Sequence, residues 1–409
     1  MLSDVGFKLR NVVISGILFA DDVLLISRTS AGLKKLLNRV KWKFDALCLS
    51  ISVDKSQIVS PADESWDLYD GYNNIQFSLK SVAQYKYLGT WMYGSMYKTG
   101  AEKQKYCIKQ AHKYKHSCFY VSKFGPDIVD VICCTWKNVA IPSILFGCES
   151  IPFCETNIEE IERVQSQVAK FALGVKATTP NICAQTELGF KPFRQLLYES
   201  QLKFYSRLLF LPQDRLASQA LHEHLSGTWH SPYMDYIADI RSKLNMMRVP
   251  VLHSTIREMT EKYFVDKTNI ALSNLKWVYP IEKFSRQSYV SENQLSTTIT
   301  EFKFENENLG NKAPRTDRPR MKHCPLCPVP SVISGIHLLF HCQALSSIRS
   351  HTGITSYINQ STLFDIPIEE AYKRFVNGQT ASGYDLSLEN YLERAKCMHV
   401  MKTLWFSKW

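Results

Sequence analysis

The sequence predicts an α+β protein in which short strands come first and helices follow. In residues 11–95, apolar runs flank short polar turns, which is typical of β-hairpins. From residue 99 to 213, apolar residues recur at steps of three and four, which is the period of a helix. A compact group of cysteines and histidines at residues 323–342 predicts a small metal-binding knuckle.

The composition indicates a folded, basic protein. The chain has 409 residues, enough for two or three domains of ordinary size. Hydrophobic residues make up 45% and charged residues 21%, which excludes a largely disordered chain. Lys and Arg outnumber Asp and Glu by 49 to 38, and the net charge of +11 favours a polyanionic partner such as nucleic acid. The alternative is a basic surface that serves only solubility.

Neither a membrane span nor a secretory signal is expected. The sequence has no uninterrupted apolar run of about eighteen residues, and its start lacks the apolar core of a signal peptide. We therefore expect an intracellular protein, in the nucleus or cytoplasm, whose twelve cysteines are mostly reduced. Those in apolar patterns are expected to be small core residues: Cys48, Cys107, Cys118, Cys133, Cys134, Cys148, Cys154, Cys183 and Cys397.

The first strands and helix follow from local patterns. Apolar runs within residues 12–26 lead into and out of Ala20-Asp21-Asp22, which predicts a β-hairpin with an acidic turn. Residues 30–48 have helical spacing, with Thr29 or Ser30 as the N-cap. Further short strands are expected at residues 49–53, 75–79 and 85–88.

The rest of the chain is predicted to be mainly helical. Further helices are expected at residues 101–124, 126–138, 156–174 and 193–211, over much of 235–300, and at 387–404. The first of these carries an apolar stripe of Cys107, Ala111, Tyr114, Cys118 and Val121. Residues 305–322 are polar, with a glycine and two prolines, and are expected to form a linker.

The acidic pair at the hairpin turn is a candidate cation site. Two carboxylates on a rigid turn can hold a divalent ion, and two such ions can activate a 3′-hydroxyl and stabilise a leaving pyrophosphate. Aspartate is also a preferred turn residue, so Asp21 and Asp22 could be purely structural.

Several segments, in a fixed order over about 200 residues, resemble one family. Residues 16–25 resemble the Phe-Ala-Asp-Asp palm motif of reverse transcriptases from non-LTR (LINE-type) retrotransposons. Residues 49–56 resemble the segment that follows the paired aspartates, and residues 85–89 resemble the Tyr-Leu-Gly primer-grip strand. Residues 141–149 resemble a thumb segment ending in Tyr-Gly-x-Glu, and residues 186–212 continue the likeness.

The resemblance implies the end of a polymerase palm followed by a helical thumb. Asp21 would be a ligand of catalytic Mg²⁺ or Mn²⁺, and Asp22 would lie at the same site. Lys55 would act near the incoming triphosphate, the alternative being a solvated lysine. Tyr87 and Gly89 would belong to the primer-grip strand and contact nucleic acid.

The expected palm is incomplete. Two metal ions need at least one more carboxylate facing Asp21, which in polymerase palms lies on an earlier strand. Only twenty residues precede Asp21, and Asp4 is the only acid among them. A strand, a crossover helix and a return strand would not fit in that length. We therefore expect a truncated polymerase without fingers or the first catalytic aspartate, inactive alone and partnered by a missing N-terminal portion.

A zinc site is predicted near the C-terminus. Cys324 and Cys327 have Cys-x2-Cys spacing, and four residues separate His337 from Cys342. Three thiolates and one imidazole satisfy tetrahedral Zn²⁺ in a closed, structural site. The alternatives are free buried thiols with a surface histidine, or His341 in place of His337. The segment also resembles the Cys-Cys-His-Cys motif that follows the thumb in LINE-type polyproteins.

Two basic segments are candidate nucleic-acid contacts. Residues 97–124 contain seven lysines and one glutamate, with aromatic residues between them. By resemblance this is the thumb helix along a template–primer duplex of RNA and DNA; the alternative is a solvated face. Arg318 and Arg320 lie in the second segment, the linker. The lysines opposite the apolar stripe of the first segment are Lys105, Lys109 and Lys113.

These expectations combine into one organisation and two main functions. The regions are a partial reverse transcriptase palm (1–95), a helical thumb-like region (96–235), a helical connector and basic linker (236–320), a CCHC zinc knuckle (321–343) and a helical tail (344–409). The first function is part of a LINE-type RNA-directed DNA polymerase. The alternatives are a non-catalytic, zinc-containing RNA/DNA-binding protein derived from a retroelement, or a translated relic without a role. No acidic cluster after Cys342 predicts an endonuclease.

Overall fold

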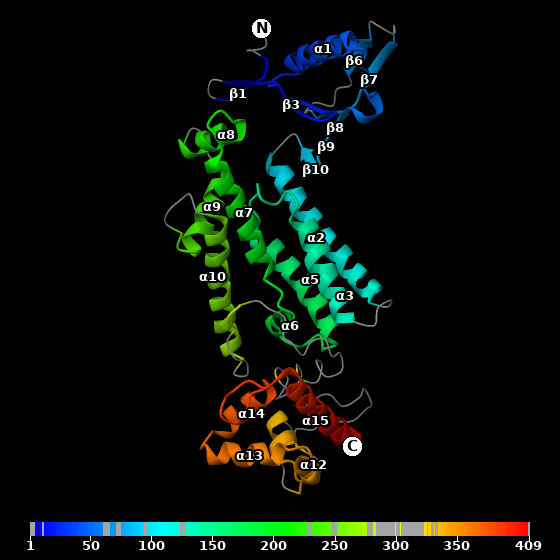
Figure 1. Ribbon diagram of the computed structural model, residues 1–409. Helices are drawn as coiled ribbons and strands as arrows, with labels where there is room; N and C mark the ends of the chain where they lie inside the picture. Colours follow the sequence, from blue (N-terminus) through cyan, green and yellow to red (C-terminus); the bar gives the residue numbers. More distant parts are fainter. Residues whose placement is uncertain are drawn as a thin grey trace. The chain divides into compact units, whose positions relative to one another are not determined.

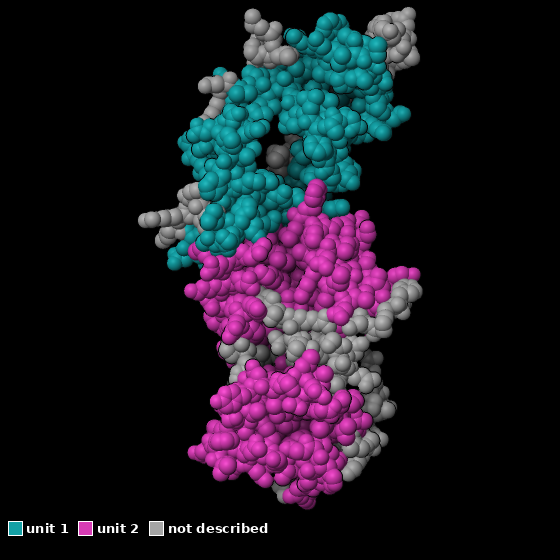
Figure 2. Space-filling view, in the orientation of Figure 1, with its two compact units in different colours: residues 1–107, 147–154, 200–256 teal, residues 108–146, 155–199, 257–409 magenta. Residues whose placement is uncertain are grey.

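The computed structural model is α+β in general: mostly helical, with a few small strand pairs (Figure 1). Its chain divides into two compact units (Figure 2). The first comprises residues 1–107, 147–154 and 200–256, and the second comprises 108–146, 155–199 and 257–409. The structure describes residues 5–9, 12–59, 66–70, 75–93, 96–122, 128–227, 231–246, 252–275, 281–283, 299, 303, 323–324, 326–328, 331 and 334–407.

The described strands form two-stranded sheets, all in the first unit. Four pairs are antiparallel, and β5 with β8 is parallel. The pairs are β1(Phe7–Leu9) with β2(Val12–Ile14), β3(Gly16–Phe19) with β4(Asp22–Leu25), β5(Ile58–Val59) with β8(Ser81–Val82), β6(Trp66–Asp70) with β7(Ile75–Leu79), and β9(Gln84–Tyr87) with β10(Thr90–Tyr93).

The predicted acidic hairpin is present. Phe19 pairs with Asp22, so Ala20 and Asp21 form a two-residue turn. Ala20 has φ of +52°, in the left-handed region that an alanine enters only at a cost of about 1–2 kcal/mol. The hairpin therefore holds its acidic turn in a strained backbone.

Helix α1(Ser30–Ala46) confirms the predicted helix and its cap, because the Thr29 hydroxyl accepts a hydrogen bond from the Gly32 amide at 3.1 Å. It packs over a small core of Ile58 and Leu79. Three partly buried residues complete that core: Leu33, Leu37 and Val53.

The predicted strand at residues 49–53 is wrong. Cys48 has φ of +57°, and the Leu49 amide donates to the Phe44 carbonyl at 2.8 Å, so this segment terminates α1. A 3-10 turn, η1(Val53–Lys55), follows. Leu49 therefore closes the end of α1, Val53 begins η1, and the residues between them do not belong to a strand.

The predicted burial of the cysteines holds only for part of the set. Cys107, Cys118, Cys133, Cys148 and Cys183 are buried, and Cys397 is partly buried. Cys48, Cys134 and Cys154 are exposed, which corrects the prediction. Cys48 lies in the cap of α1, Cys134 lies on the outer side of α3, and Cys154 precedes α5.

The remaining helices match the predicted segments at 101–124, 126–138, 156–174, 193–211 and 387–404 within a few residues. Of the predicted helical stretch 235–300, the structure describes α9 and α10, and most of residues 276–300 lies outside the described residues. Cys107, Ala111 and Cys118 of the predicted stripe are fully buried. The linker at 305–322 lies outside the described residues. The helices are α2(Met96–Val121), α3(Ile128–Thr135), the π-helical turn η2(Trp136–Ala140), α4(Ile141–Leu145), α5(Glu155–Leu173), α6(Asn181–Glu187), α7(Phe193–Phe210), α8(Leu216–Leu225), α9(Pro232–Lys243), α10(His253–Ser273), the π-helical turn η5(His337–His341), the 3-10 turn η6(Gln343–Leu345), α12(Ser346–His351), α13(Ile354–Leu363), α14(Ile368–Val376) and α15(Leu388–Ser407).

One described segment, Ile128–Leu145, is long and apolar enough by composition to cross a membrane. Its mean hydropathy is 1.5 and 39% of it is buried. The segment runs through α3, η2 and α4 and contacts α5, where the Trp136 indole donates to Gln165 at 3.1 Å. A buried, hydrogen-bonded tryptophan is typical of a core helix, and the predicted absence of a membrane span stays a prediction.

Helices α12–α15 and η5 share an aromatic core in the second unit. The Phe340 ring lies 5.9 Å from Tyr372 and 5.8 Å from Phe375, between ring centroids. The guanidinium of Arg394 lies over Phe375 at 4.4 Å. This core fixes the position of η5, the turn that carries His337.

Candidate functional site

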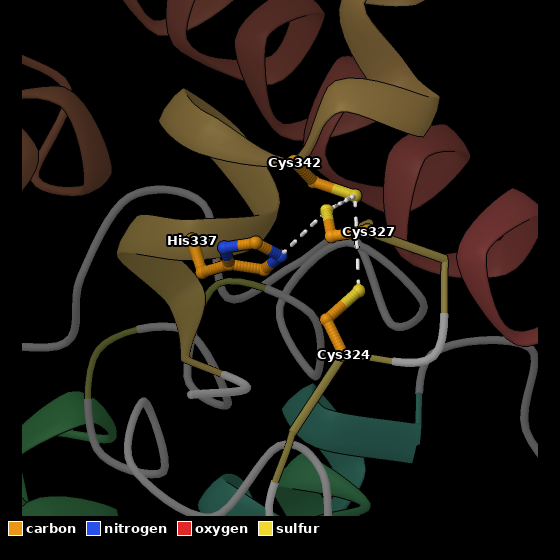
Figure 3. A group of neighbouring side chains, drawn as sticks. All are labelled: Cys324, Cys327, His337 and Cys342. Carbon is orange, nitrogen blue, oxygen red and sulfur yellow. Dashed lines mark hydrogen bonds between the residues drawn. The ribbon is translucent and has the colours of Figure 1, made fainter. Parts of the chain in front are cut away.

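Four predicted zinc ligands converge in the second unit (Figure 3). The sulfur of Cys327 lies 3.5 Å from Nε2 of His337 and 3.8 Å from the sulfur of Cys342. The sulfurs of Cys324 and Cys342 are 4.0 Å apart, and all four ligand atoms lie within 4.8 Å of one another. The group could hold a metal such as zinc.

The spacings between the ligand atoms match those of a metal tetrahedron. With Zn–S of about 2.3 Å and Zn–N of about 2.0–2.1 Å, tetrahedral ligands stand about 3.8 Å apart for S···S and about 3.6 Å apart for S···N. The observed 3.8 and 4.0 Å between sulfurs, and 3.5 Å between sulfur and nitrogen, agree with these values. Disulfides need about 2.05 Å between sulfurs, so these are separate thiols.

A π-helical turn brings His337 and Cys342 to the same side. The Cys342 amide donates to the His337 carbonyl at 2.6 Å, an i to i+5 bond. In an α-helix, residues five apart would point about 140° away from each other. The Ser334 hydroxyl accepts from the His337 amide at 3.1 Å and caps the start of this turn.

Burial determines the protonation states of Cys342 and His337 before a metal binds. Burial, and then the neighbouring Cys324 and Cys327, raise the pKa of Cys342 to about 12. Burial, with His341 and Arg349 nearby, lowers the pKa of His337 and keeps its imidazole neutral, the form that binds metal. Metal binding would therefore release protons from the thiols, whereas the neutral imidazole of His337 could bind without losing a proton.

The alternative histidines are not part of the group. His341 and His323 are both exposed, and neither belongs to the cluster. Between His337 and His341, the geometry selects His337.

The structure does not give Asp21 and Asp22 a metal-binding set among the described residues. Both are exposed, and the cluster around Cys342 is the one group of three or more potential ligands in that part of the chain. Beside them the hairpin exposes apolar side chains: Leu18 is 71% and Phe19 62% exposed. The Mg²⁺ or Mn²⁺ site stays a prediction without structural support.

The other palm-like candidates lie in the first unit. Lys55 is exposed at the end of η1, and its carbonyl accepts from the Tyr85 hydroxyl of β9 at 3.2 Å. Tyr87 ends β9, and its buried hydroxyl has no hydrogen-bond partner among the residues that the structure describes. Leu88 and Gly89 both have positive φ, which makes the tight turn between β9 and β10. The turn thus places Tyr87 and Gly89 at one end of a hairpin.

Lys105, Lys109 and Lys113 are exposed along α2, as predicted. Successive members are four residues apart, a rise of about 6 Å along the helix. Lys105 also pairs with Glu102 at 2.7 Å, and the pKa of Lys105 is raised by that hydrogen bond. The lysine stripe, as we call these three residues, is thus a cationic face whose first member is partly neutralised.

Two predicted nucleic-acid contacts lie outside the described residues, and the structure contains buried charged residues that the sequence did not predict. Arg318 and Arg320 lie outside the described residues. A buried ion pair joins Lys303 to Glu187 at 3.2 Å, and Arg349 of α12 is buried although arginine is a surface residue in most proteins. Local patterns give no signal for either, because each depends on burial by residues far away in the chain.

Comparison with known proteins adds no assignment. No protein-family model matches the chain, and no curated protein matches it significantly. The resemblance to LINE-type reverse transcriptases stays a prediction that rests on the motifs described above.

Proposed function

We propose that this chain is the C-terminal part of a LINE-type RNA-directed DNA polymerase that binds template–primer nucleic acid. The observation that carries the proposal is the acidic hairpin, in which Phe19-Ala20-Asp21-Asp22 occupies a strained two-residue turn between antiparallel strands. A strained backbone conformation persists only where the surrounding structure holds it, and such conformations are concentrated at functional sites. The lysine stripe on α2 supports the binding part of the proposal.

In this proposal the hairpin supplies one part of a polymerase site. Asp21 would hold a catalytic Mg²⁺ or Mn²⁺ together with a carboxylate from a preceding polymerase portion, and Lys55 would face the triphosphate. When bound, the ions would activate a primer hydroxyl and stabilise a leaving pyrophosphate. The exposed apolar side chains of β3, Ile17, Leu18 and Phe19, would pack against that preceding portion.

A second candidate is a non-catalytic zinc-containing RNA/DNA-binding protein. One observation favours it: four zinc ligands converge, whereas no third acidic residue joins Asp21 and Asp22 in the described part of the chain. In this alternative the predicted zinc knuckle at residues 321–343 and the lysine stripe bind the nucleic acid, and the acidic turn has no catalytic role.

Binding is tested with the full chain and a labelled RNA–DNA template–primer at about 50 mM salt, where phosphate contacts are strong. We expect saturable binding that weakens steeply as salt rises. Absence of measurable affinity at low salt would remove both candidates.

Primer extension separates the two candidates. The chain alone should not extend a primer, whereas the chain joined to the fingers and early palm of a LINE-type polymerase should do so with Mg²⁺. Replacing Asp21→Asn and Asp22→Asn in that fusion should abolish extension and leave binding unchanged. If the fusion binds template–primer but extends nothing in either form, the non-catalytic candidate is correct.

A further inference from the structure

The metal cluster has a charge that its ligands do not balance. Zn²⁺ with three thiolates and one neutral imidazole carries a net charge of −1. Cys324, Cys342 and His337 are buried, and an uncompensated charge in a buried site is costly. A metal centre of this composition therefore needs a nearby cation or several hydrogen-bond donors around its sulfurs.

Arg349 is a buried cation on helix α12, which packs against the turn η5 that carries His337. It is 8% exposed, and its Nη1 has no hydrogen-bond partner among the described residues. Buried guanidinium groups normally pair with a carboxylate, yet none of the described ion pairs involves Arg349. An unsatisfied buried donor of this kind indicates that a group is still to be bound beside it.

The chain path holds Arg349 in place. The Leu345 amide donates to the Cys342 carbonyl at 3.1 Å, which closes the turn η6 directly after the last ligand. Helix α12 begins at the next residue and contacts η5, the turn that carries His337. Arg349 is thus seven residues after Cys342 on an element packed against the ligands.

The electrostatic setting is consistent with this placement. Burial lowers the pKa of Arg349, and the thiols of Cys342 and Cys327 oppose that shift. Arg349 in turn helps to lower the pKa of His337. These shifts are consistent with a guanidinium near Cys327, His337 and Cys342.

We propose that Arg349 is a positioning residue for the metal centre, whose buried positive charge compensates the net negative charge of the zinc-bound cluster. This inference rests on the zinc part of the proposed function. Its role is to hold the metal, and Arg349 is not itself a ligand.

The test compares three variants of the full chain. Arg349→Met removes the charge and keeps much of the volume, whereas Arg349→Lys keeps the charge. Arg374→Met is the matched control. Arg374 lies on α14 in the same unit and is partly buried, but it pairs with Glu370 at 3.0 Å. Zinc affinity is measured by competition with a chromogenic chelator, and Co²⁺ substitution reports the thiolate-to-metal absorption band.

We expect Arg349→Met to weaken zinc binding about 10- to 100-fold, as loss of an outer-shell partner does. Arg349→Lys should recover part of that loss, and Arg374→Met should leave the affinity unchanged. The Co²⁺ band of Arg349→Met should shift, because the positive charge near the sulfurs is lost.

Thermal melting distinguishes a positioning role from a purely structural one. Arg349→Met should lower the melting temperature of the zinc-loaded chain more than that of the EDTA-treated chain. Equal shifts in both forms, or unchanged zinc affinity, would overturn the inference. If the unaltered chain binds neither zinc nor Co²⁺, the zinc part of the proposed function fails as well.

Discussion

Removing the lysine stripe should change how nucleic-acid binding depends on salt. Each phosphate contact contributes about 0.9 to the slope of log affinity against log salt on duplex DNA, and about 0.7 on single strands. If all three lysines contact phosphates, Lys105→Gln, Lys109→Gln and Lys113→Gln together should reduce the slope by about 2.1–2.7. Between 50 and 200 mM salt, the unaltered chain should therefore lose about 20- to 40-fold more affinity than the variant.

The structure refines this magnitude for one member of the stripe. Lys105 is already paired with Glu102 at 2.7 Å, so its ammonium must leave that partner to reach a phosphate. We expect Lys105→Gln alone to have the smallest effect. The double variant Lys109→Gln, Lys113→Gln should reduce the slope by about 1.4–1.8, or about 7- to 12-fold over the same salt range.

The assay is fluorescence anisotropy with a labelled RNA–DNA template–primer, titrated at several salt concentrations. The control replaces three exposed cations of α10 by Gln, Arg257, Lys262 and Lys267, with Glu258 and Asp266 lying among them. Because these cations are five residues apart, they do not form a stripe on one face of the helix. This control changes the net charge equally. If both triple variants reduce the slope equally, binding depends on overall charge and the stripe has no specific role.

Three further predictions concern stability. EDTA should melt the helices around Cys342 at lower temperature, because zinc at a thousand times its dissociation constant contributes about 4 kcal/mol; unchanged near-UV circular dichroism and melting would contradict a bound metal. Ala20→Gly should stabilise the first unit by about 0.5–1 kcal/mol, since glycine adopts φ of +52° freely; an unchanged or lower urea midpoint would show that the turn is not strained. Residues 1–95 expressed alone should aggregate through the exposed hairpin, which a soluble, cooperatively folding monomer would refute.

Features that depend on neighbouring residues could be predicted from the sequence. The hairpin at Ala20 and Asp21, and the cap at Thr29, follow from patterns within a few residues. The zinc ligands were also predictable, because Cys324, Cys327, His337 and Cys342 lie within 19 consecutive residues and have recognisable spacing. In each case the residues are close together in the sequence, so the short stretch of backbone between them restricts their relative positions.

Features that depend on the backbone or on distant packing could not be predicted. The apolar residues of 49–53 resemble a strand, but the positive φ of Cys48 turns them into a helix cap. His337 was predicted as a ligand, but the π-helical turn that places it beside Cys342 was not, because sequence periodicity does not reveal such a turn. The burial of Arg349 depends on the packing of α12 against η5, which links separate turns.

The two candidate metal sites differ in the number of metal ligands that the described residues supply. Around Cys342, four ligand atoms of suitable type lie at tetrahedral spacings, and Arg349 adds an unpaired donor. Around Asp21, two exposed carboxylates on a strained turn adjoin exposed apolar residues, with no further described ligand. Zinc binding can therefore occur without help from another segment. Two-ion catalysis at Asp21, if the proposed function holds, requires a further carboxylate that the described residues do not supply.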